Sequence, residues 1–335
     1  MRILWIVLFP LVLARGEHLP VQNVLDDPAF NHFYNLEYDE ALAGFEAAAA
    51  KDPGSADVQN HIAQTLLDRA MFHAGLLQSD MLKTSNSVLK TPKLEMSPAD
   101  QQRFTGAIGR AMQLAQARLD TDPDNPGALY ALGVSYGLRG EYDFVGRKAY
   151  LDALHDMIWA RKLHNRVTQV DPGMIDAQLT QGVYDYAIGS LRFGWRMIGL
   201  LGGLQGNKAR GIATLNRVAD EGATNRINAS IILVAVYRRE HRPMDAIGIL
   251  KPLIPQLPRN YLLRLELAGM YGDLGDREAA LDIVGDVERL QRAHAPGYEM
   301  LTADLVRKVR DSILMSTARN GTSVPSDNRG VASGG

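Results

Sequence analysis

The sequence predicts an all-α fold, a right-handed α-solenoid of stacked helix-turn-helix repeats. Residues 261–289 read as two amphipathic helices separated by Gly275-Asp276, with the small residues Ala268 and Ala280 where the helices would meet. Similar helix pairs recur along the chain, and Pro53 and Pro123, which each follow a helical run, lie 70 residues apart. That spacing is close to two repeats of about 34 residues. Each unit leaves an apolar face uncovered, so stacking on neighbouring copies is required for stability.

The first units are irregular. Residues 17–35 form an entry segment that ends in an aromatic cluster, and residues 38–50 form a helix with apolar residues at helical spacing. Asp52-Pro53 ends this helix, because proline disfavours the helical conformation in the residue before it. The first half of this unit is degenerate, which is typical of a terminal capping repeat. A further helix is expected from Ala56 to about Gln78.

The middle of the chain departs from a plain repeat. Residues 83–97 are polar and predict a surface loop, after which Ser97-Pro98 supplies an N-cap and a first-turn proline for a helix to Asp120. Residues 125–139 form the next first helix. The helical pattern then continues over residues 141–170, which predicts a long or doubled second helix.

The C-terminal half returns to the repeat pattern after an irregular insert at residues 189–207. Residues 316–335 lack apolar periodicity and are expected to be disordered, so the solenoid is assigned to residues 17–315. The expected helices in this half span residues 174–188, 208–220, 227–239, a pair within 261–289, and 297–315.

The N-terminus resembles a secretory signal. Arg2 is followed by a twelve-residue apolar run and by small residues at Ala14 and Gly16, which predicts a signal peptide at residues 1–16 and cleavage after Gly16. The run is too short to span a bilayer comfortably, since a spanning helix needs about 20 residues. The protein is therefore expected to be exported, either periplasmic or secreted. A buried N-terminal helix and a retained anchor are the alternatives.

Composition excludes several function classes. The chain has no cysteine, which excludes disulfides, thiolate metal sites and a cysteine nucleophile. Its formal net charge is -2, so no global field favours nucleic acid or anionic lipid.

Several segments resemble a known family. Tyr150-Leu151-Asp152-Ala153, Gly189-Ser190-Leu191, the 202–207 loop and Pro258-Arg259-Asn260-Tyr261 occur in a familiar order. The chain resembles exported bacterial tetratricopeptide repeat (TPR) proteins and, more distantly, the tetratricopeptide repeat protein 39 family, over roughly residues 105–290. The resemblance implies an all-helical scaffold and provides no catalytic motif.

No motif for metal or nucleotide chemistry emerges. None of the eight histidines has an i, i+4 partner, and the nine-residue separation of His155 and His164 excludes chelation on one helix. The glycine-rich run at 199–206 lacks the GK[ST] ending of a phosphate-binding loop. We therefore expect no cofactor, no metal and no catalytic residue.

Asp152 and Asp156 are interpreted as members of a salt-bridged helix face. A paired-carboxylate hydrolase on a helical toroid is a minor alternative that requires a deep pocket with at least two acids.

The insert has two interpretations. Phe193 and Trp195, interrupted by Arg192 and Arg196, are typical of an interfacial membrane contact. This supports an alternative function, a peripheral membrane protein that docks through residues 189–204. The insert is also expected to pack into the superhelix and fill its concave side, as aromatic-rich segments usually bury themselves.

The leading prediction is a non-enzymatic, exported scaffold that binds a protein or peptide segment in its concave groove. The first helix of each pair lines that groove, where amide, phenol and guanidinium groups can pair with a bound backbone or carboxylate. Aligning the repeats places these residues on the concave side: Asn60, Gln64, Tyr130, Val134, Tyr186, Asn228 and Arg238.

Overall fold

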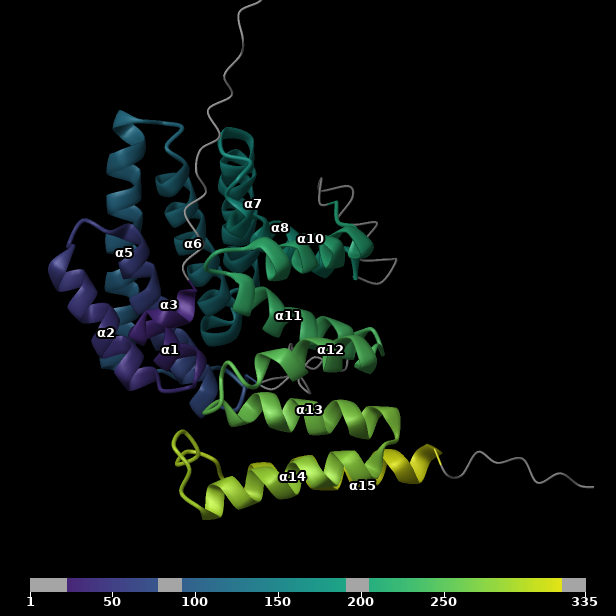
Figure 1. Ribbon diagram of the computed structural model, residues 1–335. Helices are drawn as coiled ribbons and strands as arrows, with labels where there is room; N and C mark the ends of the chain where they lie inside the picture. The colour runs from purple at the N-terminus through teal and green to yellow at the C-terminus, as the bar shows by residue number, and fades with distance from the viewer. Residues whose placement is uncertain (1–22, 78–91, 191–204, 321–335) are drawn as a thin grey trace, which may run out of the picture.

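The computed structural model describes residues 23–77, 92–190 and 205–320, and these form thirteen α-helices with no strand. Helices that follow one another in the chain pack against each other, which confirms the all-α prediction and is consistent with an α-solenoid (Figure 1). The predictions for the signal peptide, for the loop at 78–91 and for Arg192, Phe193, Trp195 and Arg196 of the insert fall outside the described residues.

Polar N-caps begin three of the four N-terminal helices, α2 being the exception. The Asp27 carboxylate accepts from the backbone N–H of Ala29 at 2.8 Å, and Ser97 Oγ accepts from that of Asp100 at 3.1 Å, which confirms the predicted Ser97 cap. The helices in this part are α1 (Pro28–Tyr34), α2 (Tyr38–Lys51), α3 (Ala56–His73) and α5 (Pro98–Thr121).

The helical run at 141–170 is interrupted, and the second helix is long but not doubled, because residues 141–147 continue the first helix. Helix α6 (Pro126–Tyr142) passes into a π-helical turn at Asp143–Arg147, and α7 spans Tyr150–Val170. Lys148 lies between them with φ at 57°, in the left-handed region that interrupts an α-helix. The sequence does not reveal this break, because apolar residues recur at helical spacing on both sides of it.

The C-terminal helices stack as successive layers in Figure 1. Ala268 and Ala280 are fully buried at the contact between α13 and α14, as the spacing predicts. The last helix begins at Ala303 instead of 297, because residues 297–302 form turns that place Tyr298 and Leu301 in the core. It continues to Asn320, beyond the predicted end of the folded region. The helices are α8 (Gln178–Gly189), α10 (Lys208–Glu221), α11 (Arg226–Arg239), α12 (Pro243–Leu253), α13 (Tyr261–Leu274), α14 (Arg277–Arg292) and α15 (Ala303–Asn320).

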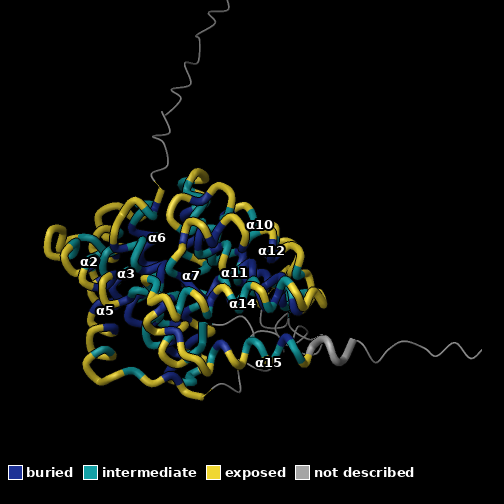
Figure 2. Tube along the Cα trace, turned by 60° about the horizontal axis from the view of Figure 1, so that its bottom comes forward, coloured by how far each residue is buried: buried dark blue, intermediate teal, exposed yellow. Residues whose placement is uncertain are grey.

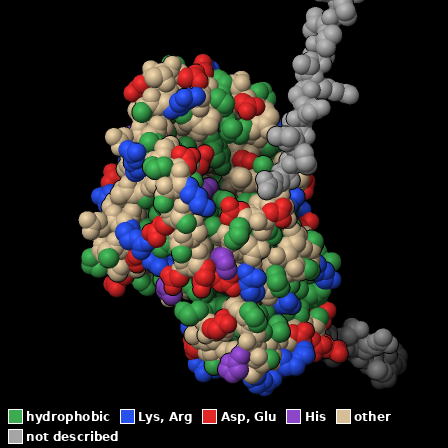
Figure 3. Space-filling view, turned by 60° about the vertical axis from the view of Figure 1, so that its left-hand side comes forward, with side chains coloured by type: hydrophobic (Ala, Val, Ile, Leu, Met, Phe, Trp, Pro, Cys, Tyr) green, Lys and Arg blue, Asp and Glu red, His purple; other side chains and the backbone are tan. Residues whose placement is uncertain are grey.

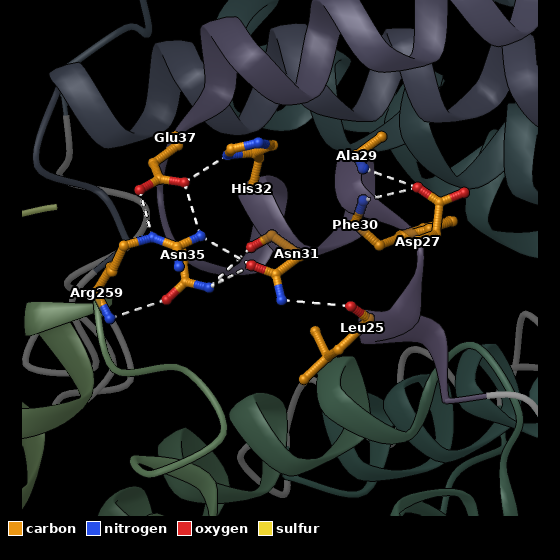
Figure 4. A network of polar contacts seen from close by, with 9 residues as sticks. All are labelled: Leu25, Asp27, Ala29, Phe30, Asn31, His32, Asn35, Glu37 and Arg259. Carbon is orange, nitrogen blue, oxygen red and sulfur yellow. Dashed lines mark hydrogen bonds and ion pairs between the residues drawn. The ribbon is translucent and has the colours of Figure 1, made fainter. Parts of the chain in front are cut away.

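The N-terminal unit folds back onto the loop before α13 (Figure 4). Arg259 Nε donates to Glu37 Oε1 at 2.6 Å, and its backbone N–H donates to Asn35 Oδ1 at 3.0 Å. Asn260 Nδ2 donates to the carbonyl oxygen of Tyr34 at 2.8 Å. Burial alone would raise the pKa of Glu37, but hydrogen bonds to Arg259 and His32 outweigh it and lower that pKa. These contacts join segments more than 200 residues apart and close the interior of the molecule.

Buried residues follow the inner faces of the helices, while exposed residues concentrate on their outer turns (Figure 2). The main core is continuous from α1 to α13, because the closure brings the N-terminal aromatics beside the later repeats. Acidic and basic side chains are interspersed on the face in Figure 3, in line with the small net charge. No helix in the described part of the chain is long and apolar enough to cross a membrane.

Candidate functional site: an interior cavity

The helices surround a half-open cavity of about 970 Å³. Its wall is formed by residues of α1, α2, α3, α6, α7, α8 and α11, and most of the lining side chains are apolar or aromatic. Cavities of several hundred Å³ with apolar walls and a few polar groups are typical ligand sites. The cavity is therefore the candidate functional site of the molecule.

Five of the seven predicted groove residues line this cavity: Asn60, Gln64, Tyr130, Val134 and Asn228. Tyr186 does not line it; its hydroxyl lies 3.0 Å from Glu240 Oε1, and burial raises its pKa to about 12. Arg238 does not line it either. Its guanidinium is buried between α11 and α13, with Nη1 2.9 Å from Glu266 Oε2 and Nε 3.0 Å from Asp273 Oδ2.

Several of the lining polar groups hold the wall together. Asn60 Nδ2 donates to the carbonyl oxygen of Ala131 at 2.8 Å, and Asn60 Oδ1 accepts from Ser135 Oγ at 2.7 Å. The Asn60 amide thus joins α3 to α6, and its almost complete burial keeps it from reaching far into the cavity.

A second internal network surrounds Tyr130. Asn225 Nδ2 donates to the Tyr130 hydroxyl at 2.8 Å, and Asn228 Nδ2 donates to Asn225 Oδ1 at 3.0 Å. The carboxylate of Asp176 accepts backbone N–H groups from residues 223–225 at 2.8 to 3.3 Å. Burial and nearby acids raise the pKa of Tyr130, so its hydroxyl stays protonated. This network fixes the α10–α11 loop against α6.

His164 connects three helices behind the Tyr130 ring, which stacks on it at 5.1 Å between ring centroids. Its Nε2 lies 3.1 Å from the Tyr130 carbonyl oxygen and its Nδ1 lies 2.8 Å from Thr180 Oγ1. A carbonyl oxygen only accepts, so Nε2 carries the proton and Nδ1 accepts from the hydroxyl. Burial lowers the pKa of His164 to about 4, so the ring is neutral at physiological pH.

Three other lining residues are different, because Asp57, His61 and Glu141 have no hydrogen-bond or ion-pair partner for their side chains among the described residues. Asp57 and His61 lie one turn apart on the cavity face of α3. Asp57 and Glu141 are both exposed, although the protein around them raises the pKa of each carboxyl by desolvation.

The electrostatics of the cavity are one-sided. Of the described residues that line it, three are acidic (Asp57, Glu141 and Asp176) and none is Lys or Arg. Asp68, on α3, lies close enough to Glu141 for their charges to repel, and after burial this repulsion also raises the pKa of Asp68. Within the described ranges no group of three or more His, Asp or Glu side chains is arranged to hold a metal ion.

The carboxylates bear on the hydrolase alternative in two ways. The cavity contains the acids that this alternative requires. Asp156, which the sequence placed on a salt-bridged surface, is instead almost fully buried, and it accepts from Arg139 Nε at 2.6 Å and Nη2 at 2.8 Å. The bidentate pair joins α6 to α7, so Asp156 has a structural role.

No protein-family model matches this chain, and no curated protein has a matching sequence. The geometry of the cavity therefore carries the functional argument.

Sequence reasoning missed most of the wall. Phe30 and Phe45 enter the cavity from α1 and α2, where their rings pack edge to face with centroids 5.0 Å apart. Met157 and Leu154 enter it from α7. The repeat pattern predicts that α7 is the second helix of its pair and therefore lies on the outer side. Glu141 was not predicted to line a site, because the sequence around it reads as one continuous helix. The signal that could have found it is an acid placed where apolar periodicity predicts a core residue.

Proposed function

We propose that this chain is a non-enzymatic, exported binding protein that takes an apolar segment of a protein or peptide into its interior cavity. The proposal includes a right-handed superhelix of TPR-like units, in which the first helices face the ligand. The observation that carries it is the cavity of about 970 Å³, which is lined mainly by apolar and aromatic side chains.

Two features support a binding role. The wall is rigidly built, since Asn60 and His164 use their hydrogen-bonding groups to join neighbouring helices. Gln64, His61 and Glu141 face the cavity with capacity to bond to a ligand backbone or side chain. Preorganised apolar walls with a few free polar groups favour binding, because little ordering is required when the ligand enters.

Reducing the volume of the cavity tests this proposal. Gly137 lines the cavity on α6, and a Cβ added there meets no atom within 4 Å, so Gly137→Leu should place its side chain in the cavity without disturbing the helix. Gly109→Leu is the matched control, since Gly109 is exposed on α5 and also has no atom within 4 Å of an added Cβ. Binding of a pool of short, blocked, apolar peptides should be lost in the first variant and kept in the second. Equal binding by both variants would place the ligand elsewhere.

A helical hydrolase is the second candidate, favoured by the three acids in the cavity. It requires that wild type release nitrophenol from nitrophenyl glycosides and that Glu141→Gln abolish this activity. Wild type without turnover on such substrates would count against it.

Membrane docking through residues 189–204 remains a prediction, because no described residue bears on it. Liposome flotation that is lost when Phe193 and Trp195 are changed to Ser would support it. Flotation that survives both changes would count against that segment.

A further inference from the structure

Helix α7 carries an apolar stripe that the described helices leave largely uncovered. It packs mainly against α6 and α8, yet Leu151 is 82% exposed, Leu154 is exposed and Ile158 is partly exposed. These three residues are spaced at i, i+3 and i+7, so they lie on one side of the helix. Single exposed apolar residues are ordinary, whereas contiguous exposed apolar surface marks an interaction site.

The stripe continues into the half-open cavity. Tyr150 and Leu154 line the cavity and are also exposed. Because 3.6 residues complete a helical turn, Leu154 lies on the helix surface between the cavity side and Leu151. Tyr150, Leu151, Leu154 and Ile158 therefore form one surface, the α7 face, which runs from the outside of the molecule to the wall of the cavity.

Two ion pairs at α7 place their acids inside and their cations outside. Asp143 is buried, and its partner Arg147, with Nη1 2.8 Å from Oδ1, keeps 53% of its side chain exposed. Asp156 is buried as well, and Arg139, which pairs with it, keeps 40% of its side chain exposed. One exposed acid, Asp152, lies 3.8 Å from Arg147. The outward groups of both pairs are guanidinium groups, which complement an anionic surface.

Trp159 and Lys162 extend this pattern along the same helix. Both are exposed, with Lys162 Nζ 4.7 Å from the centroid of the Trp159 ring, and that ring stacks on Tyr136. Tryptophan and tyrosine are enriched at the head-group level of a bilayer, and the long side chain of lysine carries its charge out to the head groups. Helices that lie in a bilayer surface combine an apolar side with such basic and aromatic residues.

The size of the α7 face favours a bilayer over a protein partner. From Tyr150 to Trp159 the helix rises about 14 Å, and one helix is about 10 Å wide, so the strip covers roughly 150 Å². A stable protein interface buries about 800 Å² on each partner. A lipid surface does not require that area, because each inserted apolar side chain and each nearby cation adds to the affinity.

We infer that the α7 face docks this protein on a lipid bilayer that carries anionic head groups. Leu151, Leu154 and Ile158 enter the boundary between head groups and acyl chains, while Arg147 and Lys162 contact the phosphates. The inference goes beyond the proposed function, since it assigns a surface on which the protein rests and not the ligand of the cavity. It also assigns docking to a different segment from residues 189–204.

A fluorescent label at position 151 tests the inference. The chain has no cysteine, so Leu151→Cys can be labelled alone in the full chain. A nitrobenzoxadiazole group there should brighten several-fold on vesicles of phosphatidylcholine and phosphatidylglycerol, and nitroxides on the acyl chains should quench it. Met244→Cys is the matched control, because Met244 is an exposed apolar residue on α12, and its label should respond to neither.

Two further variants separate the contributions. Lys162→Gln, added to the labelled protein, should raise the amount of mixed vesicles needed for half of the signal by about fivefold and have no effect with phosphatidylcholine alone. Gly137→Leu should leave the signal at position 151 unchanged while it abolishes peptide binding. The docking surface and the cavity ligand can therefore fail independently.

Three results would overturn the inference. Protein that floats with the vesicles while the label at position 151 does not respond would assign docking to another segment. A signal that rises with protein concentration in the absence of vesicles would show that a second copy of this chain covers the α7 face. Protein that stays in solution with both kinds of vesicle would show that the face does not bind lipid.

Discussion

The cavity and the C-terminal stack differ in how their charged side chains are placed. At the contact of α11, α13 and α15, Arg238 is paired with Glu266 and Asp273, and the remaining void is only about 20 Å³, room for about one water molecule. In the cavity, Asp57 and Glu141 face about 970 Å³ without a cation. Paired charge in a filled interior holds helices together, whereas the exposed acids of the cavity are free of that structural role.

The largest effect should come from breaking the paired side of this comparison. Arg238→Met removes the cation and leaves Glu266 and Asp273 half-buried without it, which should lower the free energy of unfolding by about 3–5 kcal/mol. Urea denaturation measures the loss. The same variant, below its unfolding transition, should bind the apolar peptides like wild type. A loss below about 1 kcal/mol would show that the pair is not structural.

Acid should weaken the wall of the cavity through His164. The pKa of this ring is about 4 in the fold against 6.5 when unfolded, so the unfolded chain binds the extra proton between these values. The contribution of the neutral His164 ring to the free energy of unfolding is therefore complete above pH 6.5. It is lost as the pH falls toward 4, by about 3 kcal/mol over this 2.5-unit difference. In His164→Gln the fall in stability over this window should be shallower than in wild type. Equal slopes in the two proteins would contradict a neutral buried ring; His61, whose pKa is also about 4, contributes equally to both.

Two glycines one turn apart on α6 separate the wall from the space it encloses. A Cβ at Gly133 would lie 2.4 Å from the His164 ring, so Gly133→Ala should cost about 1–3 kcal/mol of stability. A Cβ at Gly137 meets no atom within 4 Å, so Gly137→Ala should be neutral or stabilising by up to about 1 kcal/mol. Thermal unfolding of both variants measures the difference. Equal effects would mean that α6 does not present Gly137 to a cavity.

The smallest effect is expected at Asp68. Burial, and then repulsion by Glu141, raises the pKa of this carboxyl, so its ionisation destabilises the fold increasingly as the pH rises above its ordinary pKa of 3.8. Asp68→Asn should therefore raise the melting temperature at pH 8, and the gain should vanish near pH 4, where both side chains are neutral. A variant that melts below wild type at pH 8 would show that the Asp68 carboxylate has a stabilising partner.

The helices of this fold were predictable, because apolar periodicity, Asp-Pro ends and polar caps such as Ser97 are local features. The break at Lys148 was not localised, since the residues around it keep the helical pattern and only the backbone shows the interruption. The closure by Arg259 and Asn35 was also missed, because it joins segments 224 residues apart and leaves no periodic signal.

The candidate site could be predicted only in part. Repeat alignment found Gln64, Val134 and Asn228 in the wall, because all three lie on first helices that follow the repeat geometry. It misplaced Arg238, because this side chain points from α11 toward α13, where its guanidinium pairs with Glu266. The α1 and α2 aromatics were missed because a degenerate capping unit provides no register from which to place them.

Hydrogen-exchange mass spectrometry of the full chain, with and without a blocked apolar peptide, tests the central claim most directly. If the ligand enters the interior cavity, protection should increase in α3, α6 and α8, whose residues line it, and remain unchanged in α14 and α15. Protection confined to α14 and α15, or bound peptide without added protection in α3 and α6, would contradict the account.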